Sequence, residues 1–188
     1  MNPLLKAAKE AFAFLEEQGW QACLIGGMAA VRWGRPRATQ DVDISLFSGL
    51  GDEELYVDPL LGQFQSRRED ARSFALQTRV VLIESSNKVG IDVALAGFEF
   101  EIEMIQRAKP VRFSRGLVVP TACPEDVIVT KAFANRAIDW MDVEGVMVRQ
   151  KGKLDWQMIV RELTNRCALL DDNEPLDALL RLKSKLGH

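Results

Sequence analysis

Two aspartates separated by a single residue are the part of this chain best suited to chemistry. In the segment Asp41-Val42-Asp43-Ile44, polar and apolar residues alternate as they do in a half-buried strand. Residues two apart in a strand project from the same face, so Asp41 and Asp43 are expected to point the same way. Two like charges on one face repel each other unless something offsets them. A divalent cation, Mg²⁺ or Mn²⁺, is the natural candidate, because hard cations take carboxylate oxygens and share them with substrate phosphates.

The pair alone does not decide the function. An exposed acidic strand end contains the same residues without any activity, and glycosyltransferases use such a pair to hold a metal against a nucleotide sugar. The preceding Gly26-Gly27 favours a phosphate site, because it follows the apolar segment 22–25 and precedes an expected helix. A tight turn is the plainer explanation of the two glycines. The thirteen residues between Gly27 and Asp41, however, leave room for one short helix and a return to the neighbouring strand.

A third carboxylate, Asp92, stands inside the otherwise apolar segment 90–95. Burying a carboxylate without a partner is costly, so we expect a cation or an arginine beside it. A strand edge that faces solvent is the alternative. Glu84 and Glu99 are the substitutes if Asp92 is not part of a site.

A polar stripe is predicted further along the chain. Lys131, Asn135, Asp139 and Asp142 are spaced by four, four and three residues, which would place them on one side of a single continuous helix. A solvated helix face with weak ion pairs is the alternative. In that case Asp142 only braces Arg136 or the packing of the helix.

Taken together, these motifs resemble a known family. Gly26-Gly27 followed by Asp41 and Asp43 is similar to the glycine-plus-DxD signature of the polymerase β-like nucleotidyltransferases. The segment 26–44 is more similar to the AbiEii-type branch, which includes toxins of toxin–antitoxin and abortive-infection systems. The resemblance extends over residues 20–145.

The resemblance implies a reaction as well as a fold. A nucleoside monophosphate would pass from an NTP to an acceptor hydroxyl, with Asp41, Asp43 and Asp92 as catalytic residues that hold Mg²⁺ or Mn²⁺. The acceptor stays open between an RNA 3′ end such as that of tRNA, a protein and a small molecule, and an antitoxin is an implied partner. The alternative from another class is an inactive nucleotide-binding module of the same fold, which would bind NTP without releasing pyrophosphate.

Further residues are implied to contact the nucleotide. Lys131 would reach the triphosphate and Asp139 would orient that lysine or the nucleotide. Arg37 would contact the phosphates or the acceptor, although it could instead pair with Asp41 or Asp43. The implied nucleotide-binding set is Gly26, Gly27, Arg37, Thr39, Lys131 and Asp139.

The elements that must position these residues follow from hydrophobic periodicity and turn residues. We expect helices at 4–18, 28–33 and 53–61, a loop from there to 77, strands at 22–25, 41–47, 79–84 and 90–95, and a hairpin that pairs 111–113 with 117–119. Segment 98–107 stays unassigned, and only helical patterns follow Pro120. The predicted fold class is α/β (α+β), with a nucleotidyltransferase core of mixed sheet and flanking helices at 1–120 and a C-terminal helical region at 121–188.

Composition limits the function classes. The 188 residues carry a net charge of −3, which argues against a surface that coats nucleic acid. No apolar run is long enough to cross a membrane, and the N-terminus lacks the apolar stretch of a secretory signal. The three cysteines are scattered, which predicts reduced thiols in a cytoplasmic protein. The single histidine, His188, is terminal, so histidine catalysis is not expected.

Overall fold

The computed structural model describes residues 2–188. Their contacts divide into two compact units. The first consists of Met1–Met28 and Ala38–Ala122, and the second of Ala29–Arg37 and Cys123–His188. The expected catalytic carboxylates belong to the first unit, and Lys131 belongs to the second.

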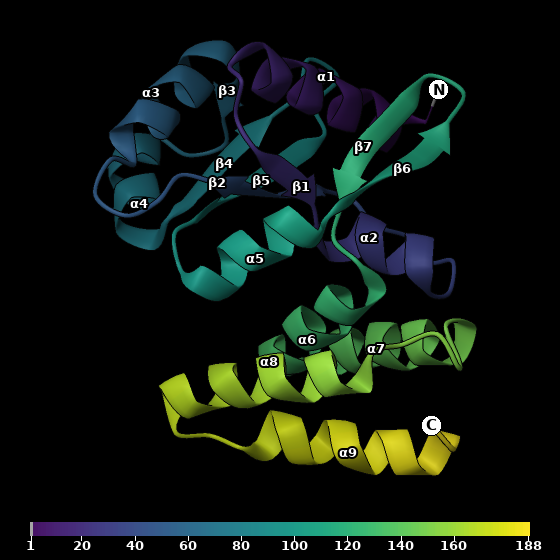
Figure 1. The fold of residues 1–188 in the computed structure, drawn as a ribbon. Helices are drawn as coiled ribbons and strands as arrows, with labels where there is room; N and C mark the ends of the chain where they lie inside the picture. Colours follow the sequence, from purple (N-terminus) through teal and green to yellow (C-terminus); the bar gives the residue numbers. More distant parts are fainter. Residues whose placement is uncertain (1) are drawn as a thin grey trace. The chain divides into compact units, whose positions relative to one another are not determined.

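The first unit contains a mixed sheet with helices on both faces (Figure 1). Its strands are β1 (Ala22–Leu24), β2 (Val42–Phe47), β3 (Gln65–Ser66), β4 (Val80–Glu84), β5 (Gly90–Ala96), β6 (Lys109–Ser114) and β7 (Leu117–Thr121), and its helices are α1 (Pro3–Glu17), α3 (Glu54–Gln63), α4 (Ala71–Thr78) and α5 (Glu99–Arg107). The described residues form seven strands in the order β3-β4-β5-β2-β1-β7-β6. β2 runs parallel to β5 and β1 parallel to β7, while the other neighbours are antiparallel. The predicted fold class of a mixed sheet flanked by helices is therefore confirmed, and so is the hairpin.

The core determines which way the polar residues of β2 point. Val42, Ile44 and Leu46 are fully buried, in one cluster with Ala8 and Leu15 of α1. α1 and α3 lie over that face of the sheet, and α5 lies on the other side (Figure 1). Because successive side chains of a strand alternate between faces, Asp43 projects from the face opposite this core.

One prediction for the first unit needs correction. The segment after α3 is not a loop, because it contains β3 and α4. α4 is short and weakly amphipathic, and it forms because Ala75 is buried and because Arg79 ends it in the left-handed conformation (φ 60°). The Arg79 side chain then donates to the carbonyl oxygens of Gly49 and Leu95, at 2.7 and 2.8 Å. These are tertiary contacts that local periodicity does not contain.

The unassigned segment 98–107 is a helix, α5. Its start is stabilised by Glu101, whose carboxylate accepts hydrogen bonds from the backbone N–H groups of Gly97 and Phe98 at 2.8 and 3.1 Å. Free N–H groups at a helix start need such acceptors. Glutamate three residues into the helix supplies one here.

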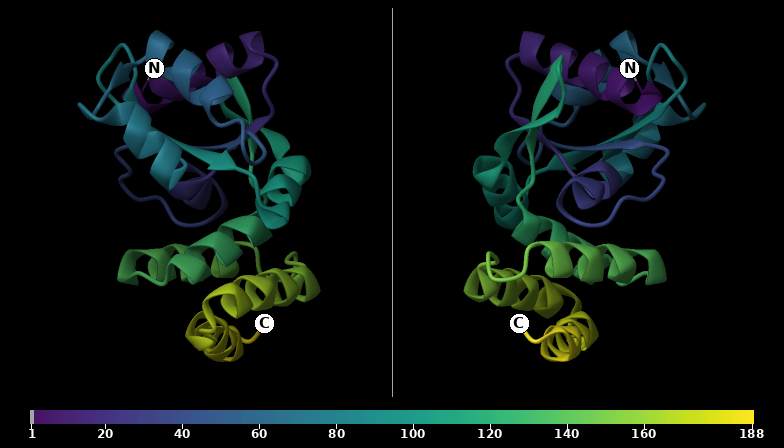
Figure 2. Two further views of the ribbon diagram at one scale, coloured as in Figure 1. Left: turned by 90° about the vertical axis from the view of Figure 1, so that its left-hand side faces the viewer. Right: turned by 90° about the vertical axis from the view of Figure 1, so that its right-hand side faces the viewer.

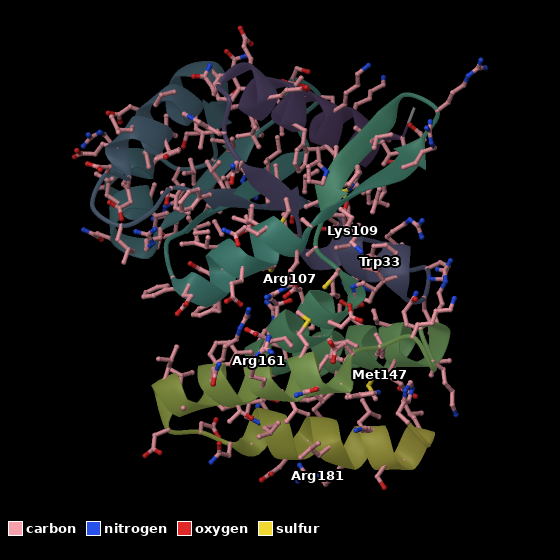
Figure 3. The ribbon with its side chains drawn as sticks, in the orientation of Figure 1. Trp33, Arg107, Lys109, Met147, Arg161 and Arg181 are labelled. Carbon is pink, nitrogen blue, oxygen red and sulfur yellow. The ribbon has the colours of Figure 1, made fainter. Side chains whose placement is uncertain are left out.

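The second unit is helical. Its helices are α6 (Pro124–Ala134), α7 (Ala137–Arg149), α8 (Trp156–Leu170) and α9 (Glu174–Leu186), together with the C-terminal part of α2 (Gly26–Trp33). α8 and α9 run side by side (Figure 2), and Met147 of α7, labelled in Figure 3, is fully buried. β7 extends one residue past Pro120, to Thr121. Within residues 2–188 only helices follow β7, and the predicted C-terminal helical part is confirmed.

The predicted continuous helix through the polar stripe is wrong. α6 ends at Ala134, and Asn135 adopts the left-handed conformation with φ 54° before α7 begins. Asparagine is one of the few residues with a side chain that takes this conformation readily. The stripe therefore lies on two helices joined by a corner.

Two expectations from composition can be compared with the structure. None of the three cysteines forms a disulfide within residues 2–188, and Cys23 and Cys167 are buried. None of the helices formed by residues 2–188 combines the length and the apolar character needed to span a lipid bilayer.

Candidate functional site

Three carboxylates of the first unit lie at the same edge of two parallel strands. The register of β2 and β5 places Asp43 directly beside Asp92, and both side chains are half-buried on the face opposite the core. Asp41 stands one residue before β2, and its carboxylate lies against Gly90 at the start of β5. A Cβ atom on Gly90 would overlap the Asp41 carboxylate, so only glycine permits this approach.

The glycine pair shapes the environment of Asp43. α2 begins at Gly26, two residues earlier than expected, and the backbone N–H of Gly27 donates to Asp43 Oδ2 at 3.1 Å. Gly26 has φ 62°, and a Cβ atom there would overlap the Asp43 carboxylate. The first turn of α2 thus holds this carboxylate directly, at the positive end of the helix dipole.

The third carboxylate has an arginine partner. Arg67 Nη2 donates to Asp92 Oδ1, and both side chains are about one-third exposed. Arg67 Nη1 lies 2.8 Å from the place where a Cβ atom on Gly90 would stand, next to Asp41. The partner that a carboxylate in an apolar strand requires is therefore Arg67.

The surroundings of Asp92 also shift its ionisation. Burial raises the pKa of the Asp92 carboxyl above its ordinary value of 3.8, the charge of Arg67 opposes this rise, and the charge of Asp41 adds to it. Burial disfavours the charged form, and so does a second carboxylate close by. A cation at this place stabilises the ionised form.

The chemistry of these donors fits a hard divalent cation. Asp41, Asp43, Asp92 and Arg67 sum to two negative charges, and carboxylate oxygens are the ligands that Mg²⁺ and Mn²⁺ prefer. Within residues 2–188, no three His, Cys, Asp or Glu side chains are already gathered as a metal site. Asp92 is held by Arg67, so metal binding at Asp92 requires this ion pair to open.

In the second unit, Lys131 lies between two carboxylates. Its Nζ is 2.8 Å from Asp139 Oδ1 and 3.3 Å from Asp142 Oδ2. Asp139 is fully buried and also binds Arg136, which precedes it by one helical turn. The corner at Asn135 brings α6 and α7 together so that these groups meet, although they do not share one helix.

Asp142 pairs with Arg37 rather than bracing Arg136. Arg37 donates to both oxygens of Asp142, from Nε at 2.6 Å and from Nη2 at 2.7 Å, while Arg136 binds Asp139 instead. A bidentate arginine–carboxylate pair fixes direction as well as distance. This pair ties α7 to the loop that leads into β2, where the half-buried Thr39 also lies.

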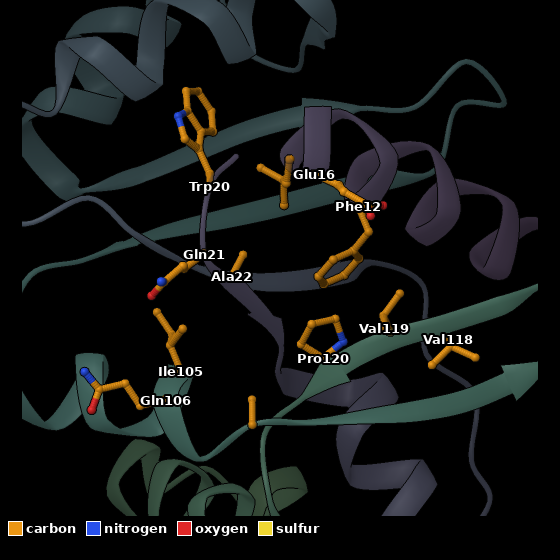
Figure 4. Close-up of a pocket in the computed structure, with 12 residues that line it drawn as sticks. Phe12, Glu16, Trp20, Gln21, Ala22, Ile105, Gln106, Val118, Val119 and Pro120 are labelled. Atoms are coloured by element: carbon orange, nitrogen blue, oxygen red, sulfur yellow. The ribbon is translucent and has the colours of Figure 1, made fainter. Parts of the chain in front are cut away.

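A cavity of about 610 Å³ lies elsewhere in the first unit (Figure 4). Phe12, Trp20, Ile105 and Pro120 are among the residues that line it. Ala22 of β1 and Val118 of β7 also line it. None of the expected site residues lines this cavity.

Arg67 and Gly90 are the site residues that the sequence did not reveal. Arg67 stands in a polar segment that also contains Arg68 and Arg72, and nothing local distinguishes it from them. The one available signal was the requirement of Asp92 for a positive partner. Nothing in the sequence marked Gly90 as a site residue, because a glycine at the start of a strand commonly belongs to the turn before it.

Comparisons with known proteins bear on the fold. No family model matches this chain, and no curated protein matches it either. The crystal structure of an antigenic nucleotidyltransferase-like protein from Paracoccidioides brasiliensis aligns over 96% of this chain and 94% of its own, with 15% identity and a TM-score of 0.57. Two structures of the antibiotic-resistance factor ANT(2'')-Ia, one of them in complex with adenylyl-2''-tobramycin, align over 97% and 95% of this chain and 92% and 95% of their own, at 16% and 17% identity. Their TM-scores of 0.42 and 0.43 are too low to support an argument. The first likeness shows that this chain has a nucleotidyltransferase-like fold.

Proposed function

We propose that this chain is a metal-dependent nucleotidyltransferase. It transfers a nucleoside monophosphate from an NTP to an acceptor hydroxyl and releases pyrophosphate. The observation that supports this most is the grouping of Asp41, Asp43 and Asp92 at the ends of two adjacent strands, beside the first turn of α2. In the reaction the acceptor oxygen attacks the α-phosphorus in line as the bond to the pyrophosphate oxygen breaks, and the hydroxyl proton leaves to solvent.

The residues of the first unit have distinct tasks in this proposal. Asp41, Asp43 and Asp92 would hold the divalent cation, which when bound neutralises phosphate charge and lowers the pKa of the acceptor hydroxyl. Gly27 donates its N–H to Asp43 and so orients that carboxylate. The other amides at the start of α2 are available to the phosphates, because a helix N-terminus attracts anions.

The roles of Lys131 and Asp139 are taken from the family resemblance. Lys131 would neutralise triphosphate charge, and Asp139 would orient the ammonium group. The contact of 2.8 Å between Lys131 Nζ and Asp139 Oδ1 supports the second role. The AbiEii-type relationship and the toxin activity are parts of the same proposal, and the proposed acceptor is an RNA 3′ end, a protein or a small molecule.

The test is transfer of label from each of the four NTPs, labelled at the α-phosphate, in the presence of Mg²⁺ or Mn²⁺ and total cellular RNA. The decisive variant is Asp43→Asn, which keeps an oxygen for the Gly27 N–H but removes the charge. Asp70→Asn is the matched control, because Asp70 is exposed and its carboxylate pairs with Arg68 at the surface. We expect label in RNA or protein with the wild type and with Asp70→Asn, and at least about a hundredfold less with Asp43→Asn, since about 3 kcal/mol or more of transition-state stabilisation is a usual loss for one such charge.

The inactive binding module makes a different prediction. Metal-dependent NTP binding in calorimetry, with no label transferred and no pyrophosphate released from any NTP, would support that module and exclude transfer to RNA or to the protein itself. A small-molecule acceptor would then be the one remaining form of the transferase. An equal rate in Asp43→Asn and wild type would remove Asp43 from the mechanism.

A further inference from the structure

Arg67 reaches the carboxylates along a row of residues that crosses the sheet. β3 pairs with β4, and the backbone N–H of Arg67, directly after β3, donates to the carbonyl oxygen of Leu82 at 3.0 Å. Leu82 is the register partner of Asp92, and Asp92 is the register partner of Asp43. The short edge strand therefore fixes where Arg67 stands relative to both aspartates.

The guanidinium group and two carboxylates crowd over one glycine. Nη2 binds Asp92, and Nη1 lies 2.8 Å from the place where a Cβ atom on Gly90 would stand, where only Asp41 Oδ1 comes nearer. Gly90 has no Cβ atom to keep these groups apart. A positive charge thus occupies the region between Asp41 and Asp92, where the proposed function requires a divalent cation.

We propose that Arg67 is an internal cation that occupies the Asp41–Asp92 half of the metal site, and that a divalent metal must displace it to bind there. This inference rests on the proposed function, because it assigns a competitor to the same metal ligands. The metal and the guanidinium would both bind the Asp92 carboxylate, and two positive charges this close repel each other. The Arg67 side chain is 30% exposed, which leaves solvent into which it can move.

A simple structural role makes the opposite prediction. If Arg67 only ties β3 to the sheet, its loss lowers stability with or without metal and leaves metal affinity unchanged. If Arg67 competes with the metal, its loss removes the competitor. Metal then binds more tightly, and metal restores the stability that was lost.

The test is titration of Mn²⁺ into the metal-free full-length protein by calorimetry, without nucleotide. Arg67→Gln is compared with wild type and with Arg68→Gln, a matched control whose arginine forms an exposed pair with Asp70. We expect Arg67→Gln to bind Mn²⁺ roughly fivefold more tightly than wild type, because an ion pair about one-third exposed is worth only a modest factor. Arg68→Gln should match wild type, and Arg67→Lys should fall between wild type and Arg67→Gln.

Thermal unfolding in chelator and in Mn²⁺ supplies a second measurement that does not depend on activity. Mn²⁺ should raise the unfolding temperature of Arg67→Gln more than that of wild type. Equal or weaker Mn²⁺ affinity in Arg67→Gln would overturn the competition, and so would equal Mn²⁺-induced shifts. If pyrophosphate release then stays intact in the wild type, the proposed function survives without this role. If no protein binds Mn²⁺, the competition and the metal dependence of the proposed function both fail.

Discussion

At the scale of single residues, the structure pairs two buried carboxylates with cations. Asp139 and Asp142 both lie beside Lys131, and the three residues are called the Lys131 cluster. Asp139 is fully buried, and burial alone would raise the pKa of its carboxyl, but hydrogen bonds from Arg136 and Lys131 outweigh this and lower the pKa below its ordinary value of 3.8. A carboxylate whose pKa is lowered on folding stabilises the folded state while it is ionised. This stabilisation is complete above the unfolded pKa and is lost as the pH falls through the folded pKa.

The pH dependence of stability tests this account. Asp139→Asn should lower the free energy of unfolding by about 3 kcal/mol at pH 7, because it leaves Lys131 with a weaker partner in a buried place. The difference from wild type should shrink as the pH falls below 3.8, the value of the unfolded carboxyl. Urea unfolding between pH 7 and 3 measures it, with the exposed Asp52→Asn as control. A difference that stays constant over this range would contradict the assignment.

At the scale of elements, the corner between α6 and α7 creates the Lys131 cluster. Asn135 turns the chain with a left-handed backbone, and its side chain accepts a hydrogen bond from Trp140 Nε1 at 2.8 Å and donates one to Glu174 Oε2 at 2.6 Å. A continuous helix would place Lys131 and Asp139 about two turns apart, roughly 12 Å along the axis, beyond direct contact. The corner brings them within 2.8 Å.

Two substitutions at Asn135 separate the backbone effect from the side-chain effect. Asn135→Gly and Asn135→Ala both remove the hydrogen bonds to Trp140 and Glu174, but only alanine is strained at φ 54°. Asn135→Ala should therefore be less stable than Asn135→Gly by about 1 kcal/mol in urea unfolding. If the two variants are equally stable, the left-handed backbone at residue 135 does not determine the stability of the corner, and the hydrogen bonds of the Asn135 side chain do.

At the scale of the whole molecule, the two units are interleaved along the chain. The chain leaves the first unit after Met28, returns at Ala38 and leaves again after Ala122. The loop after α2 therefore belongs to the second unit, where Arg37 binds Asp142, and four residues later the chain supplies Asp41. No single cut in the sequence separates the two units.

The toxin role that is part of the proposed function is tested by expressing the protein in cells. As an AbiEii-type toxin, the chain would modify an acceptor that the cell needs, so its expression in a bacterial host should arrest growth. Asp43→Asn at the same protein level should restore growth to at least about tenfold more colonies, because it removes transfer without removing the fold. Unimpaired growth with the wild type would exclude the toxin role and leave nucleotidyl transfer itself to the labelling experiment.

Local sequence determined much of the fold and the composition of the candidate site. The alternation through Asp41-Val42-Asp43-Ile44 predicted a half-buried strand, because the period of side chains in a strand is two wherever one face is buried. Gly26-Gly27 after an apolar segment predicted a close approach of the backbone to a phosphate, and in the structure the group that lies against this pair is the Asp43 carboxylate. The expectation of helices after Pro120 agrees with the start of α6 at Pro124, where a proline and the acidic residues Glu125 and Asp126 suit a helix N-terminus.

Only the tertiary structure decided the partners of these residues. Arg67 and Asp92 are 25 positions apart, and Arg37 and Asp142 are 105 positions apart. The chain offers many arginines, and periodicity says nothing about which of them a sheet register or a helix corner brings to a given carboxylate. The short strand β3 and the corner at Asn135 contributed to that choice. β3 depends on its pairing with β4, and the corner combines the left-handed backbone of Asn135 with hydrogen bonds to Trp140 and to the distant Glu174.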